Sequence, residues 1–112
     1  MSISILQFGW PTAQRLPVLT DEQNDALEAL EEAIWADDVP TATMLDPYVL
    51  IPTQSDLELS ILGELTESEY IPAILVVKKC ERLFIHDGHH RATRARLDKQ
   101  HVRSVVFNAD KE

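Results

Sequence analysis

The fold of this chain is decided by the stretch Phe84-Ile85-His86-Asp87-Gly88-His89-His90-Arg91-Ala92-Thr93-Arg94-Ala95. In this stretch the apolar end of a strand is followed by one glycine and then by the start of a basic helix. Gly88 lets the backbone turn sharply or approach a ligand closely. The first free N–H groups of a helix carry partial positive charge, and the side chains of His89, His90 and Arg91 add to it. The stretch therefore predicts an anion-binding turn with the design of a phosphate site.

Length and composition predict one domain that spans residues 1–112, because 112 residues leave room for a single modest core. No apolar run approaches the roughly 20 residues that cross a membrane, and the first residues lack the basic and apolar regions of a signal peptide. The single cysteine, Cys80, cannot form an internal disulfide, which is typical of a reducing compartment. We therefore expect a cytoplasmic protein with no membrane contact.

The charge is divided unevenly along the chain. The net charge is −9, but residues 1–70 carry fourteen acidic residues against one basic residue, whereas residues 71–112 carry nine basic residues against five acidic ones. Repulsion from the acidic part should slow the approach of a polyanion. The pattern disfavours duplex DNA as a ligand and favours a small phosphorylated ligand in a local basic pocket.

Apolar periodicity and capping signals predict an α+β fold with a mixed sheet and a few helices. Thr20 and Gln23 form a capping box that opens an acidic helix ending near Asp37, and Ser55 with Glu58 forms a second capping box. The second helix is expected to turn four apolar residues inward, namely Leu57, Ile61, Leu62 and Leu65. Strands are expected over 2–8, 48–51, 73–77, 82–85 and 102–107, and a basic helix over 89–99. The runs 73–77 and 82–85 should form a hairpin.

With these elements in order, the chain resembles the ParB/sulfiredoxin-like superfamily. Its members share a small α+β core and a Gly-x-[His/Arg]-Arg turn that enters a helix, and Gly88-His89-His90-Arg91 matches this turn. Leu50-Ile51-Pro52-Thr53 resembles the early strand and loop of the family, and Ile71-Pro72-Ala73-Ile74-Leu75-Val76 resembles its next strand. The resemblance covers about Asp46 to Phe107. It divides the domain into a core over 45–108 and an N-terminal extension with the acidic helix over 1–44.

The resemblance implies that the chain binds a nucleotide through its phosphates, ATP or another one, together with Mg²⁺. The phosphate-binding residues would be Gly88, His89, His90, Arg91 and Arg94. Arg91 would make the main contact, since a guanidinium matches a phosphate in a fork geometry. The histidines are not expected to hold a metal ion, because His89 and His90 are adjacent and would point to different sides of a helix.

Two departures from the family narrow the implied chemistry. Sulfiredoxins have a catalytic cysteine directly after the glycine, where this chain has His89, so thiol chemistry is not expected. Partition proteins carry a helix-turn-helix domain after the core, whereas this sequence stops at Glu112. The sequence Asp87-Gly88-His89-His90-Arg91 is most similar to the corresponding turn of the free-serine-kinase-type members.

Phosphate transfer would also need a carboxylate, either to hold Mg²⁺ or to accept a proton. Glu58 and Asp87 are the catalytic candidates. Each has a structural alternative, because Glu58 can act as the capping-box partner of Ser55 and Asp87 can cap the basic helix.

Three functions from different classes follow from these observations. The first is a small nucleotide-dependent phosphotransferase or hydrolase. The second is a non-catalytic module of the same fold that senses a nucleotide or binds a partner protein through the acidic N-terminal helix. The third is a ParB-like nuclease or DNA-associated accessory protein, which the overall charge disfavours.

Overall fold

A two-stranded hairpin forms the centre of the fold. The computed structural model describes residues 1–36, 42–60 and 73–110. In it β5 (Ile74–Lys79) pairs antiparallel with β6 (Arg82–Asp87). Cys80 and Glu81 connect them with positive φ angles of 53° and 63°, as a two-residue hairpin turn requires. The predicted hairpin is therefore confirmed.

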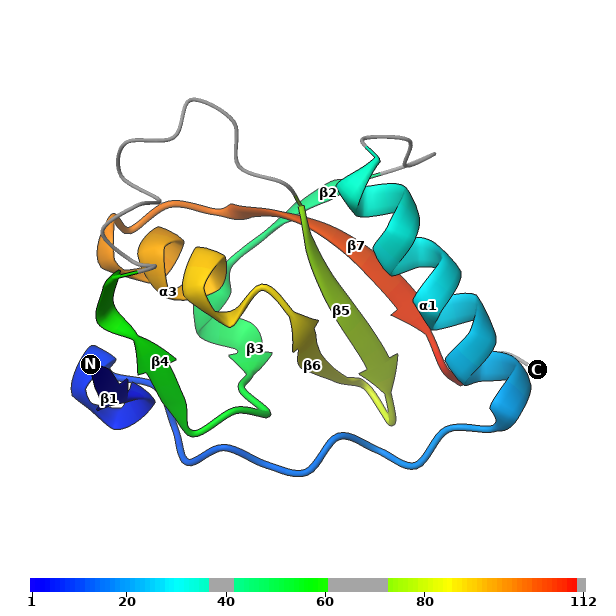
Figure 1. Cartoon of the computed structure of the whole chain (residues 1–112), viewed down its shortest axis with the longest axis horizontal. Coiled ribbons are helices and arrows are strands. Elements are labelled where there is room, and N and C mark those ends of the chain that lie inside the picture. The colour runs from blue at the N-terminus through cyan, green and yellow to red at the C-terminus, as the bar shows by residue number, and fades with distance from the viewer. Residues whose placement is uncertain (37–41, 61–72, 111–112) are drawn as a thin grey trace.

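The hairpin lies inside a five-stranded mixed sheet with the order β2-β7-β5-β6-β3 (Figure 1). β7 (Val102–Asn108) runs parallel to β5, and β3 (Leu50–Ile51) runs parallel to β6. β2 (Thr43–Leu45) pairs antiparallel with β7 at one edge. Together with its two described helices, the sheet makes a compact α+β domain, which is the predicted fold class.

The two helices cover opposite faces of this sheet, because successive residues of a strand point to opposite sides. Ile74 and Val76 of β5 pack with Ala92 of α3 (His89–Leu97). Leu75 and Val77 of the same strand pack instead with α1 (Asp21–Trp35). Figure 1 shows β5 running between the two helices. The sheet is thus the middle layer of the domain.

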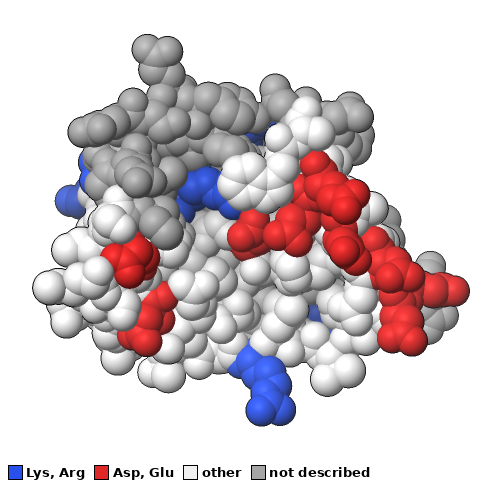
Figure 2. Space-filling view, in the orientation of Figure 1, with Lys and Arg blue, Asp and Glu red and all other residues white. Residues whose placement is uncertain are grey.

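Helix α1 begins with the predicted capping box. Thr20 Oγ1 accepts a hydrogen bond from the Gln23 amide at 3.1 Å, and Gln23 Oε1 accepts one from the Thr20 amide at 3.0 Å. Leu27 and Ile34 are buried against the sheet. The acidic residues lie on the other side of the helix, and Figure 2 shows Asp and Glu side chains gathered over α1. The predicted acidic helix is confirmed.

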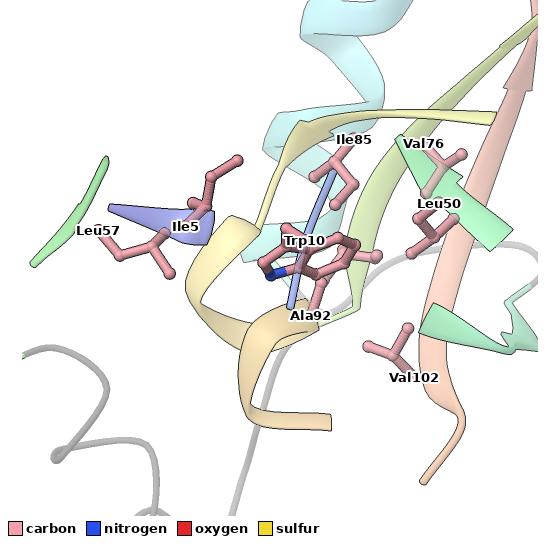
Figure 3. Packing of buried hydrophobic residues seen from close by; sticks show 9 residues of the cluster. Ile5, Trp10, Leu50, Leu57, Val76, Ile85, Ala92 and Val102 are labelled. Atoms are coloured by element: carbon pink, nitrogen blue, oxygen red, sulfur yellow. The ribbon is translucent and has the colours of Figure 1, made fainter. Parts of the chain in front are cut away.

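The first ten residues differ from the expected strand over 2–8. β1 (Ser2–Ser4) is short and is followed by a 3-10 turn over Ile5–Phe8, which Gly9 ends with a φ of 84°. Trp10 then enters the core and lies among Ile85, Ala92 and their neighbours (Figure 3). Residues of the N-terminal extension therefore pack into the same core as the sheet.

The helix predicted to begin at the capping box of Ser55 and Glu58 is wrong at its start. Asp56–Glu58 form β4, which pairs antiparallel with β1. Three of the residues expected to point inward lie outside the described residues, namely Ile61, Leu62 and Leu65. Leu57 is buried as expected, but it is buried from a strand.

The strand predicted over 48–51 is also shorter than expected. Asp46 caps a 3-10 turn over Pro47–Val49, so the strand is reduced to β3 (Leu50–Ile51). The predicted basic helix and final strand are present as α3 and β7. Across the described parts of the chain, every helix is too short or too polar to cross a lipid bilayer.

Candidate functional site

The candidate site is the turn from β6 into α3. Gly88 stands at the N-cap of α3 with a φ of 103° and a ψ of 28°, and no side chain caps the helix there. The Ala92 amide donates to the Gly88 carbonyl at 2.9 Å. The amides of residues 89–91 therefore precede this hydrogen bond, at the positive end of the helix. Asp87 does not cap the helix, so that alternative is wrong.

Gly88 is required here by space as well as by its backbone angles. A Cβ atom at this position would lie 2.5 Å from Ile74 Cγ2 and 2.9 Å from Arg91 Nη2. Ile74 is fully buried in the centre of the sheet. The turn therefore brings the Gly88 backbone directly against β5 and against the Arg91 guanidinium.

Arg91 is the charged centre of the turn, and it is only 7% exposed. Its Nη2 donates to Asp87 Oδ2 at 3.2 Å. Its guanidinium carbon lies 5.3 Å from the centre of the Trp35 ring, within the range of a cation–π contact. The structure thus brings Asp87, Gly88 and Arg91 together, as the sequence predicted.

His89 serves as a hydrogen-bond acceptor inside the fold. The Thr53 amide donates to His89 Nε2 at 3.0 Å, and Thr53 Oγ1 donates to the Ile85 carbonyl at 2.6 Å. Burial lowers the pKa of His89 to about 4. The imidazole is therefore neutral at physiological pH, and it fixes the loop after β3 to the start of α3.

His90 has the same role toward the neighbouring strand. The Glu58 amide donates to His90 Nε2 at 2.8 Å. Burial lowers the pKa of His90 as well, although the nearby Glu58 carboxylate opposes this shift. In the predicted capping box this amide would have bonded to Ser55. His90 takes that place and so holds β4 beside the turn.

The Glu58 carboxylate is engaged in an ion pair with the amino terminus, at 2.5 Å from the Met1 nitrogen. Ser60 Oγ also lies 3.4 Å from Glu58 Oε1. The hydrogen bond from the amino terminus is the main reason why the pKa of Glu58 is lowered. The carboxylate is therefore ionised at neutral pH, and its low pKa makes it a weak general base.

Arg94 lies one helical turn beyond the glycine turn. Its Nε donates to Asp98 Oδ2 at 3.1 Å. It also lines a hollow of about 150 Å³ between the second half of α3 and the start of β7, with Arg91 and Arg103 among the other lining residues. The predicted phosphate-binding residues therefore lie at two neighbouring sites. Gly88 and the histidines are at the turn, and Arg94 is at this hollow.

Sequence reasoning missed two residues around α3. Trp35 follows the buried residue Ile34 and is exposed at the end of α1. A tryptophan outside the apolar repeat of an acidic helix is a sequence signal that could have identified it. Arg96 lies 4.6 Å from the Trp10 ring centre and 4.1 Å from that of Tyr48. Its guanidinium also donates to the carbonyls of Phe8 and Gly9, so it fixes the N-terminal segment to α3.

Metal-ligating side chains do not cluster in the described ranges. Nowhere in 1–36, 42–60 and 73–110 do three His, Cys, Asp or Glu side chains converge in a way that could hold a metal ion. Asp87 precedes Gly88, and its carboxylate is paired with Arg91.

We expect the free energy of unfolding of the domain to fall as the pH is lowered, because of His89. Its folded-state pKa of about 4 lies below the ordinary 6.5, so the unfolded chain binds more protons between these values. The stabilisation is complete above pH 6.5 and is lost as the pH falls toward 4, by up to about 3 kcal/mol.

Urea unfolding between pH 7 and pH 4 measures this loss. In His89→Gln the amide oxygen can accept the Thr53 hydrogen bond without titrating, so the slope should become shallower. His101→Gln is the control, since His101 is exposed. If His89→Gln and His101→Gln gave the same pH profile as the parent protein, His89 would not be the group that titrates.

No model of a known protein family matches the chain, and the search of curated proteins found no match.

Proposed function

We propose that the chain is a ParB/sulfiredoxin-like domain that binds a nucleotide by its phosphates at the turn Asp87–Arg91. One observation carries the proposal. Gly88 has a left-handed conformation at an uncapped helix start, with the Arg91 guanidinium directly beside it. The positive end of a helix, a glycine that admits close approach and an arginine are together suited to phosphate oxygens.

The order of elements supports the same proposal. From β3 to β7 the described elements are a short strand, the strand β4, a hairpin, the glycine turn, a helix and a final strand. The order expected from the resemblance to the ParB/sulfiredoxin-like superfamily has a short helix from Ser55, where the structure has β4, and it agrees with the other described elements. The extension before β2 adds α1 to the face of the sheet opposite α3, so α1 does not take part in the core that holds the turn.

The residues of the turn have different roles in the proposed site. The backbone amides of residues 89–91 and the Arg91 guanidinium face the phosphates. His89 and His90 act through position, because their Nε2 atoms hold the amides of Thr53 and Glu58. Neutral imidazoles in these positions keep two neighbouring segments fixed around the phosphate-binding backbone.

The ion pairs of the two candidate carboxylates favour binding over chemistry. Glu58 is paired with the amino terminus, and Asp87 is paired with Arg91. A general base must accept a proton from its substrate, and the hydrogen bond from the amino terminus lowers the pKa of Glu58, which makes this carboxylate less suited to that task. We therefore propose a nucleotide-binding module, and phosphate transfer would require Glu58 to leave the amino terminus.

Calorimetric titration of ATP, ADP and CTP with Mg²⁺ tests the proposal. We expect binding in the parent protein and a loss of about 2 kcal/mol in Arg91→Ala, because a charge-assisted phosphate contact disappears. Arg91→Lys keeps the charge without the fork geometry and should lose less than Arg91→Ala. Arg82→Ala is the control, since Arg82 is exposed at the other end of the hairpin.

Since Arg91 is buried, the fold of each variant is checked by circular dichroism before titration. An unchanged dissociation constant in a folded Arg91→Ala protein would remove Arg91 from the site. Absence of binding by any of these nucleotides at millimolar concentration would remove the proposed function.

A further inference from the structure

Trp35 is a large aromatic side chain that the fold leaves on the surface. It ends α1, and 64% of it is exposed, whereas the other tryptophan of the chain, Trp10, is buried. An indole ring has a large apolar surface, and tryptophan is highly buried on average in folded domains. The exposed ring therefore calls for an explanation outside the packing of α1.

The position of Trp35 ties it to the candidate site. Its ring centre lies 5.3 Å from Arg91 Cζ, and Arg91 Nη2 lies 3.2 Å from Asp87 Oδ2. The same Nη2 would be 2.9 Å from a Cβ atom on Gly88. Gly88, the guanidinium and the indole thus follow one another in direct contact. Trp35 reaches this place from the helix on the opposite face of the sheet.

The contact with Arg91 leaves most of the Trp35 ring exposed. A cation–π contact occupies one region of an aromatic face, and most of the Trp35 surface stays accessible to another planar group. The acidic side chains of α1, including Glu31 and Glu32, precede Trp35 along the helix and repel phosphates from that direction. The charges therefore favour an anionic ligand that has its phosphates at Gly88 and an aromatic end at Trp35 over the reverse orientation.

We propose that Trp35 is the base-stacking platform of the nucleotide site, with Arg91 lying between the phosphates and the base. This inference rests on the proposed function and adds the part of the ligand that phosphate binding alone does not recognise. Stacking on an aromatic side chain accepts any base, because every base has a π-face. The platform therefore discriminates a nucleotide from an inorganic polyphosphate, and it discriminates little between one base and another.

Calorimetry with three magnesium complexes tests the platform, using ATP, CTP and inorganic tripolyphosphate as probes. We expect the parent protein to bind ATP and CTP about tenfold more tightly than tripolyphosphate, because only the nucleotides can stack. In Trp35→Ala this difference should disappear, because the affinity for the nucleotides falls to that for tripolyphosphate. Trp35→Leu should behave like Trp35→Ala, because leucine restores apolar area without a π-face.

Tyr48→Ala is the matched control. Tyr48 is also exposed, at 56%, and its ring also lies over an arginine, 4.1 Å from Arg96 Cζ. It belongs to the turn before β3, and its hydroxyl donates to the Arg96 carbonyl near the C-terminal end of α3. All three probes should bind Tyr48→Ala as they bind the parent protein.

Fluorescence gives an independent measurement of the same contact. In Trp10→Phe the only remaining tryptophan is Trp35, so quenching reports directly on its ring. ATP should quench this emission and tripolyphosphate should leave it nearly unchanged, since a stacked base is needed for quenching.

The outcomes separate the platform from the phosphate site. If tripolyphosphate bound the parent protein as tightly as ATP, or if the difference survived in Trp35→Ala, the platform would be refuted and the phosphate site would stand. If none of the three probes bound, the phosphate site would fall and the platform with it.

Discussion

Gly88→Ala should lower the free energy of unfolding by about 4 kcal/mol, whereas Gly9→Ala should lower it by about 1 kcal/mol. Both glycines have positive φ angles, 103° and 84°, so both substitutions strain the backbone. The two glycines differ in the room that their surroundings leave for a Cβ atom. A Cβ on Gly88 meets Ile74 Cγ2 at 2.5 Å, whereas a Cβ on Gly9 meets the flexible end of Arg96 at 3.4 Å. The difference between the two variants isolates the close approach at the candidate site.

Urea unfolding of the two variants measures this difference. A double variant, Gly88→Ala with Ile74→Ala, removes the nearest clashing atom, so its loss should be smaller than the sum of the two single losses. If Gly88→Ala prevents folding altogether, recovery of a folded protein in the double variant tests the same contact. Equal losses for Gly88→Ala and Gly9→Ala would mean that the turn does not depend on close approach to β5.

Trp10→Ala should cost about 4 kcal/mol, because it removes a buried indole together with its hydrogen bond. Trp10 is 4% exposed, and its Nε1 donates to Thr93 Oγ1 at 2.9 Å. Thr93 Oγ1 in turn donates to the His89 carbonyl at 2.7 Å in the first turn of α3. Figure 3 shows the ring between residues from the N-terminal segment, the sheet and α3.

Trp35→Ala is the matched control for this prediction, since it removes the same side chain from the surface. Its cost should stay below about 1 kcal/mol, the size of one exposed cation–π contact. Thermal and urea unfolding of both variants give the comparison. A loss of less than 1 kcal/mol in Trp10→Ala would contradict the packing of the N-terminal segment into the core.

The sequence predicted the elements whose signals are local. The capping box of Thr20 and Gln23, the β-branched run of β5 and the strand β7 each carry their own pattern, and each formed as expected. The hairpin followed from two adjacent apolar runs and a short connection. Such signals need no partner elsewhere in the chain.

The failures came where a distant residue decides the outcome. Ser55 and Glu58 have the spacing of a capping box, but β1 pairs with residues 56–58 and His90 takes the Glu58 amide. Pairing with a segment more than fifty residues away cannot be read from a local spacing. The strand expected over 48–51 was shortened because the Asp46-Pro47 turn extends into it.

In the candidate site, too, some residues were predictable from the local sequence and others depend on distant residues. Gly88 and Arg91 were predicted from their own turn, and the structure places them together with Asp87. The roles of His89 and His90 depend on their burial against Thr53 and Glu58, which lie more than thirty residues earlier. Trp35 reaches Arg91 only because α1 crosses the opposite face of the sheet.

The most direct test of phosphate binding at the start of α3 is a ¹H–¹⁵N correlation spectrum recorded during addition of MgATP. The proposed site requires that the largest shifts fall on the backbone amides of Gly88, His89, His90 and Arg91, because the amides of residues 89–91 face the phosphates and Gly88 adjoins them. The amides of Cys80 and Glu81, at the other end of the hairpin, should not move. Unshifted amides over residues 88–91 at saturating MgATP, or their largest shifts elsewhere in the domain, would contradict the site.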